Sequence, residues 1–98
     1  MSFKITGGKG FHFNFPNGIT VSVQFGPGNY CEHYDDDILR WSSSAGKGTI
    51  ESHDAEVAIW KEGGEWITHE YNGDDQVTGY KSFEEVWEIL KWAEAKKT

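Results

Sequence analysis

The stretch Phe11–Phe25, FHFNFPNGITVSVQF, decides the fold of this 98-residue chain. Apolar and polar residues alternate on both sides of residues 16–18, and a period of two predicts two strands that each bury one face. A two-residue loop would set Asn14 opposite Val21 and mix polar with apolar side chains. A three-residue loop pairs Phe13 with Val21 and gathers the apolar side chains on one face. We therefore predict a hairpin with a three-residue loop whose glycine is left-handed.

The C-terminal residues predict an α-helix that begins after Ser82. Ser82 and Glu85 have the spacing of a capping box, in which each side chain bonds the other residue's backbone N–H. The helix should place one apolar stripe across a face of the sheet. The residues of this expected stripe are Phe83, Val86, Trp87, Leu90 and Ala93, widened by Ile89 and Trp92.

A second hairpin is predicted from Glu56–Trp60 and Trp66–His69, joined through residues 62–64. Both of its faces carry apolar residues, which indicates a central place in the sheet. Gln76–Tyr80 is a candidate for a last short strand, after a turn at residues 71–75. Residues 26–55 leave alternatives open, since Ile38–Trp41 fits either a strand or a short helix.

These elements predict one α+β domain spanning residues 1–98. Its antiparallel β-sheet of four to six strands, with two hairpins, packs against one C-terminal α-helix.

The chain carries a net charge of −7, from 16 acidic and 9 basic residues. Phosphate contacts with DNA or RNA need a basic surface, so we expect no direct nucleic-acid binding. No stretch has the roughly 20 apolar residues of a membrane span, and the first ten residues lack the apolar run of a signal peptide. One cysteine forms no internal disulfide. We expect a cytoplasmic protein without a membrane partner.

No spacing of reactive residues predicts catalysis. The four histidines do not form a zinc pattern, and the acidic runs at residues 35–37 and 74–75 do not match a calcium loop. Cys31 and His33 could form a nucleophile–base pair, but no orienting group is identifiable. Residues 44–49 fail the spacing of a phosphate loop. We therefore predict no enzyme activity, no metal and no cofactor.

The Gly26-Pro27-Gly28 turn is the candidate ligand-binding loop. Successive backbone N–H groups in such turns can form a concavity that binds anions. The alternative is a plain strand-ending turn whose Tyr30 folds back onto the core. The candidate ligand-binding residues are Gly26, Gly28, Asn29, Tyr30, Cys31, His33, Arg40 and Trp41.

Residues 15–31, FPNGITVSVQFGPGNYC, resemble the N-terminal signature of small uncharacterised phage-encoded proteins of about this length. A later strand like Ala55–Trp60 and a final helix like Ser82–Trp87 extend the resemblance over most of the chain. The resemblance implies a phage origin and the host cytoplasm as the place of action. It assigns no functional residues.

Small acidic phage proteins without catalytic motifs are often inhibitors of host defence, and by analogy we expect the same of this chain. We expect a non-enzymatic binding protein that counters host antiviral defence by blocking a host protein or by sequestering a small nucleotide signal. The net charge favours the blocker, and the glycine loop favours the nucleotide binder. The alternative is a structural or housekeeping phage interaction module with no ligand, as a homo-oligomer joined at sheet edges.

Overall fold

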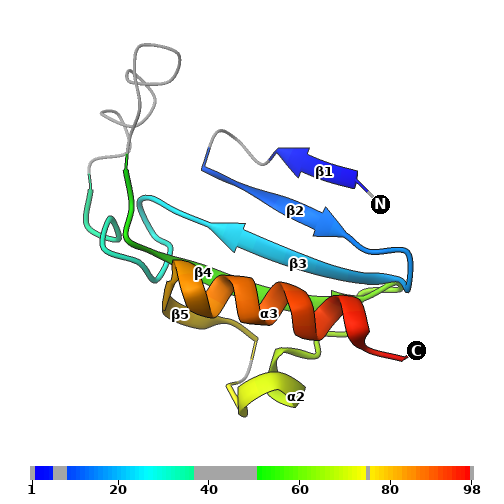
Figure 1. Ribbon diagram of the computed structural model, residues 1–98. Coiled ribbons are helices and arrows are strands. Elements are labelled where there is room, and N and C mark those ends of the chain that lie inside the picture. The colour runs from blue at the N-terminus through cyan, green and yellow to red at the C-terminus, as the bar shows by residue number, and fades with distance from the viewer. Residues whose placement is uncertain (1, 6–8, 37–50, 75, 98) are drawn as a thin grey trace.

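The computed structural model describes residues 2–5, 9–36, 51–74 and 76–97, with residues 2–5 as backbone only (Figure 1). Its antiparallel sheet holds five strands in chain order: β1 (Ser2–Ile5), β2 (Gly10–Asn14), β3 (Ile19–Gln24), β4 (Asp54–Lys61) and β5 (Thr78–Ser82). The described helices are α2 (Thr68–Asn72) and α3 (Phe83–Ala95). The predicted α+β fold is therefore confirmed, with β1 as a strand that the sequence analysis did not anticipate.

The β2–β3 hairpin has the predicted register. Phe13 pairs with Val21, and the Phe15 N–H donates to the Ile19 carbonyl at 2.8 Å across a three-residue loop. Gly18 has a φ of 84°, the left-handed conformation that the loop requires and that glycine adopts without steric cost. The alternation of apolar and polar residues determines the register of this hairpin, since a slip of one residue would turn its apolar face to solvent.

The second hairpin is only partly confirmed. Trp60 faces Trp66 as expected, but as an isolated bridge, and the chain enters α2 at Thr68 instead of continuing as a strand. The Thr68 hydroxyl accepts from the Ile59 N–H at 3.0 Å and donates to the Gln76 carbonyl at 2.8 Å. The buried Thr68 side chain thus satisfies the Ile59 N–H of β4, which would bond a backbone carbonyl if the second strand of the hairpin continued.

The segment before α3 differs from the predicted boundaries. Residues 71 and 72, expected in a turn, end α2, and Gly73 closes that helix with a φ of 84°. The last strand is shifted to Thr78–Ser82 and pairs with β4 through an irregularity between Ala55 and Val57. The expectations for residues 38–50 lie outside the described residues.

The core lies between α3 and the facing side of β3 and β4. α3 packs mainly on β3, β4 and β5, and Figure 1 shows it lying lengthwise along β3 and β4. The capping box is confirmed, since Ser82 Oγ accepts from the Glu85 N–H at 3.3 Å and Glu85 Oε1 accepts from the Ser82 N–H at 3.1 Å. The helix therefore begins at the predicted residue.

The predicted apolar stripe on α3 is wrong at its N-terminal end. Ile89 and Ala93 are fully buried, whereas Phe83 is 75% exposed and Trp87 is 55% exposed. Helical spacing groups all of these residues, but the direction of the helix axis over the sheet decides which of them meet another element. Only the middle and the C-terminal part of the stripe enter the core.

Asn17, in the β2–β3 loop, holds the C-terminal end of α3. Its Nδ2 donates to the Ala93 carbonyl at 2.8 Å and to the Lys96 carbonyl at 2.9 Å. Its Oδ1 accepts from the Ile19 N–H at 3.0 Å. One loop side chain thus satisfies helix carbonyls that have no partner within the helix.

We predict that Asn17→Ala lowers the free energy of unfolding by about 1–3 kcal/mol, since it removes these hydrogen bonds. Asn17→Asp should also destabilise, because it sets a carboxylate at the negative end of the helix. Urea unfolding measures both. Pro16→Ala, in the same loop and exposed, is the matched control. An Asn17→Ala protein as stable as this control would contradict the assignment.

Candidate functional site

The loop of residues 26–36 follows β3 and contains most of the predicted ligand-binding residues. Gly26 and Gly28 have φ values of 88° and 81°, so both need the backbone freedom of glycine. The Gly28 N–H donates to the Tyr34 carbonyl at 3.0 Å, and the Cys31 N–H donates to the Asn29 carbonyl at 2.7 Å. The Asn29 side chain donates to the Phe25 carbonyl at 2.7 Å. The loop is thus closed on itself by its own hydrogen bonds.

Carboxylates from the next described segment occupy two further amides of this loop. The Tyr30 N–H donates to Glu56 Oε2 at 2.7 Å, and the Glu32 N–H donates to Asp54 Oδ1 at 2.6 Å. The protein's own carboxylates therefore stand where a bound phosphate would accept from these two amides. A role of the loop in anion binding stays a prediction, and a phosphate would have to displace these contacts and overcome their charge.

Cys31 and His33 take part in different contacts. Cys31 is buried, and its thiol lies 3.9 Å from the Gly26 carbonyl oxygen. His33 Nδ1 lies 2.7 Å from Asp36 Oδ2, and its Nε2 lies 2.7 Å from the Glu51 carbonyl oxygen. These contacts give both residues a structural role. Arg40 and Trp41, the other two candidate residues, lie outside the described residues.

Tyr30 does not fold back onto the core as the alternative reading expected. Tyr30 is 47% exposed and Tyr34 is 40% exposed. Their rings stack with the centroids 5.4 Å apart and the planes 8° apart. The backbone of Tyr30 lies beside β5, where the Tyr80 N–H donates to the Tyr30 carbonyl at 2.8 Å. A Cβ on Gly79 would lie 2.6 Å from the Tyr30 Cβ, so only glycine permits this approach.

We predict that Gly79→Ala lowers the free energy of unfolding by about 1–3 kcal/mol and displaces Tyr30, because the added methyl group overpacks this contact. Urea unfolding and the NMR chemical shifts of Tyr30 and Tyr34 measure the two effects. Gly28→Ala is the control: it imposes backbone strain of about 1–2 kcal/mol, yet nothing lies within 4 Å of the added atom. Unchanged tyrosine shifts in Gly79→Ala would refute the contact.

His33 ties the loop to the segment that leads into β4. Both of its ring nitrogens face oxygen acceptors, so both must donate and the ring must be protonated for both hydrogen bonds to form. The Glu51 carbonyl is the main cause that raises the pKa of His33, the Asp36 carboxylate adds to it, and desolvation opposes it. The protonated ring stabilises the folded loop.

A raised pKa in the folded state makes this contribution pH-dependent. It is fully present below pH 6.5, the ordinary pKa of histidine, and is lost as the pH rises through the folded-state pKa. The pKa of Glu32 is lowered, mainly by the hydrogen bond from the His53 backbone N–H, so its contribution is lost only in acid, as the pH falls below 4.5. The two effects therefore occupy separate pH ranges.

We predict that His33 titrates above pH 6.5 and that the free energy of unfolding falls as the pH rises through that value. NMR titration and urea unfolding between pH 5.5 and 8.5 measure both quantities. His33→Gln should lose this dependence, while His69→Gln, at an exposed position of α2, should keep it. A pKa of His33 below 6.5 would show that the ring is not held as a double donor.

An acidic surface surrounds the stacked tyrosines. Residues 26–36 and 51–56 carry six carboxylates and no lysine or arginine. We call this surface the acidic tyrosine face, and its residues are Tyr30, Glu32, Tyr34, Asp35, Asp36, Glu51, Asp54 and Glu56. The acidic run at residues 35–37 is visible in the sequence. The sequence does not show that residues 51–56 lie beside this loop, where they form hydrogen bonds with Tyr30, Glu32 and His33.

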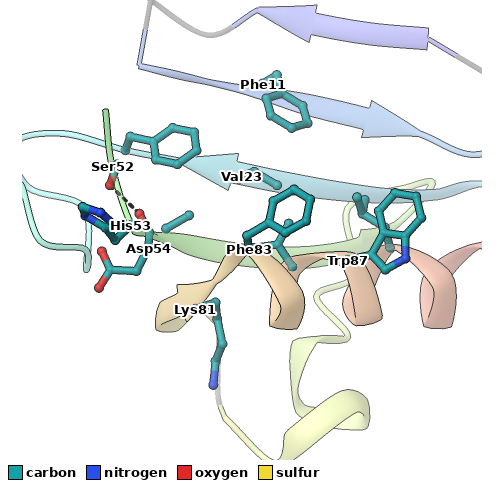
Figure 2. Close-up of a pocket in the computed structure, with 12 residues that line it drawn as sticks. Phe11, Val23, Ser52, His53, Asp54, Lys81, Phe83 and Trp87 are labelled. Atoms are coloured by element: carbon teal, nitrogen blue, oxygen red, sulfur yellow. Dashed lines mark hydrogen bonds between the residues drawn. The ribbon is translucent and has the colours of Figure 1, made fainter. Parts of the chain in front are cut away.

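A second surface, which the sequence analysis missed, is an apolar groove between α3 and the β2–β3 side of the sheet. Its volume is about 340 Å³. In Figure 2, Phe83 and Trp87 point from α3 toward the strands, and Phe11 points from β2 toward these two side chains. We call it the α3–β2 groove; it is lined by Phe11, Val23, Phe25, Ser52, His53, Asp54, Ala55, Lys81, Phe83, Val86, Trp87 and Leu90.

The described part of the chain shows no cluster of three or more His, Cys, Asp or Glu side chains arranged to hold a metal ion. Within the same residues, neither helix is long and apolar enough to cross a membrane. Comparisons of the chain with protein-family models, curated proteins and solved structures found no match.

Proposed function

We propose that this protein is a non-enzymatic binding protein that counters host antiviral defence by blocking a host protein. The observation that carries the proposal is the acidic tyrosine face, where two exposed, stacked tyrosines lie among six carboxylates. Tyrosine is enriched among the residues that dominate binding energy at protein interfaces. An acidic surface of this kind complements a basic surface, such as one that a host enzyme uses for nucleic acid or nucleotides.

The contacts of the loop favour a protein partner over a nucleotide signal. Two of its amides already donate to Glu56 and Asp54, and the surrounding carboxylates repel phosphate groups. A basic protein surface meets no such obstacle, because its cations approach the same carboxylates favourably. A net charge of −7 also speeds encounter with a basic partner at low ionic strength.

The loop is built firmly enough to act as a preformed binding surface. Hydrogen bonds to Glu51, Asp54, Glu56 and Tyr80 hold residues 30–33 from two sides. A preformed surface loses little conformational entropy on binding, which favours affinity. The role against host defence rests on the phage-type signature at residues 15–31.

The second candidate function is a structural or housekeeping interaction module without a ligand. The exposed α3–β2 groove favours it, because apolar patches on soluble proteins are often interaction sites. Such a module would assemble through the groove and would leave host defence unaffected.

A plating assay tests the blocking function. Phage sensitive to defence are plated on strains that each carry one defence system and express the chain. The wild-type chain should restore plating against at least one system. The triple variant Tyr34→Ala, Asp35→Lys, Glu51→Lys should not, because it removes an exposed aromatic ring and reverses two charges of the face.

The matched control changes an exposed tryptophan and two exposed glutamates elsewhere: Trp66→Ala, Glu62→Lys and Glu94→Lys. It alters the net charge by the same amount and should restore plating as the wild-type chain does. Failure of the wild-type chain against every system, or full activity of the face variant, would overturn the proposal. Release of an intact nucleotide on denaturing protein purified from infected cells would contradict blocking as the mechanism.

A further inference from the structure

A β-bulge interrupts the pairing of β4 with β5, the strand at one edge of the sheet (Figure 1). At the bulge, one residue of β4, Glu56, lies opposite two residues of β5, Gly79 and Tyr80. The paired residues on either side are Ala55 with Lys81 and Val57 with Thr78. An extra residue of this kind bends the strand and re-aims a side chain, and such bulges are over-represented next to functional sites.

Tyr80 holds an unfavourable backbone conformation in this bulge. Its φ is 53°, and among the described residues it is the one non-glycine residue with a positive φ. The left-handed conformation costs free energy for a residue with a Cβ, whereas glycine adopts it freely. The bulge therefore explains the conformation at position 80, but it does not explain why a tyrosine occupies that position.

The side chain of Tyr80 contributes little to the core. Tyr80 is 58% exposed, more than either Tyr30 or Tyr34. Hydrophobic stabilisation scales with the apolar area removed from water, so burial of this ring offsets little of the backbone strain. Residues held in rarely populated backbone conformations cluster at binding and active sites, where the strain is maintained for function. An exposed and strained tyrosine thus supports a functional role for its side chain.

The bulge also holds the acidic tyrosine face in place. The Tyr80 N–H donates to the Tyr30 carbonyl at 2.8 Å, and Glu56 Oε2 accepts from the Tyr30 N–H at 2.7 Å. Gly79 lies so close to Tyr30 that an added Cβ would be 2.6 Å from the Tyr30 Cβ. Both strands of the bulge therefore contact Tyr30, and Tyr80 lies directly beside the face.

We propose that Tyr80 is a third tyrosine of the binding surface and contacts the same basic protein partner as Tyr30 and Tyr34. This inference rests on the proposed blocking function. Tyrosine is enriched among the residues that dominate binding energy at interfaces. It supplies a large and rigid contact area at a low cost in conformational entropy. With Tyr80, the surface extends from the loop of residues 26–36 onto the edge strand β5.

Two substitutions separate the binding role of Tyr80 from a role in folding. Tyr80→Gly and Tyr80→Asn both remove the ring, and both residues adopt the left-handed conformation more readily than tyrosine. Each variant should unfold at a urea concentration no lower than the wild-type chain does. Each should nevertheless lower rescue in the plating assay at least about 10-fold, the loss typical of an interface residue that matters for binding. Tyr80→Phe keeps the ring and should retain rescue.

The matched control is Trp66→Ala, which removes an exposed ring beside Trp60 at the other end of β4 and should leave rescue unchanged. The NMR chemical shifts of the Tyr30 and Tyr34 rings should stay unchanged in Tyr80→Asn, since that variant keeps the backbone N–H that holds Tyr30. A lost ring contact with the partner, and not a displaced loop, then accounts for the lost rescue.

Full rescue by both Tyr80→Gly and Tyr80→Asn would overturn the role of Tyr80 and leave the blocking function intact. A lower urea midpoint for both variants would also overturn it, because the tyrosine would then serve the fold. If the wild-type chain rescues plating against no defence system, the blocking function itself fails, and the role of Tyr80 fails with it.

Discussion

The burial of the central β3–β4 strand pair under α3 is the constraint on which the rest of the structure depends. Val21 pairs with Ile59 and Val23 with Val57, and all four side chains lie in one core with Ile89. A 98-residue chain has little core to spare, so this contact between one helix and one sheet face carries most of its hydrophobic stabilisation. The capping box at Ser82 and the Asn17 contacts hold the two ends of α3 over that pair.

Both candidate surfaces follow from this arrangement. A single helix cannot cover a five-stranded sheet, so the sheet face beside it remains open as the α3–β2 groove. β3 and β4 are joined by a long connection whose described ends, residues 26–36 and 51–53, meet at one end of the sheet. The Asp54 and Glu56 carboxylates, at the start of β4, accept hydrogen bonds from amides of residues 30 and 32, and this creates the acidic tyrosine face. His53 connects the two surfaces, since it lines the groove and contacts Glu32 of the acidic tyrosine face.

The sequence predicted well wherever a local rule acts alone. Strand periodicity and glycine chemistry gave the register of the first hairpin, and the Ser82–Glu85 spacing gave the start of α3. Prediction failed where a side chain takes the place of a backbone partner, and where segments distant in the chain come into contact. Thr68 closes the edge of β4 with its hydroxyl, so a segment with strand-like residues begins a helix instead. Tyr30 lies against Gly79, about fifty residues away along the chain, and no local sequence pattern predicts that contact.

The sequence by itself determined the α+β class, the apolar face of the β2–β3 hairpin, the helix start and the acidic character of the protein, because these depend on neighbours in the chain and on composition. Only the tertiary structure decided that Phe83 and Trp87 remain exposed while Ile89 and Ala93 are buried. Helical periodicity identifies an apolar stripe but not which part of it meets the sheet. That choice depends on how far one helix reaches across five strands.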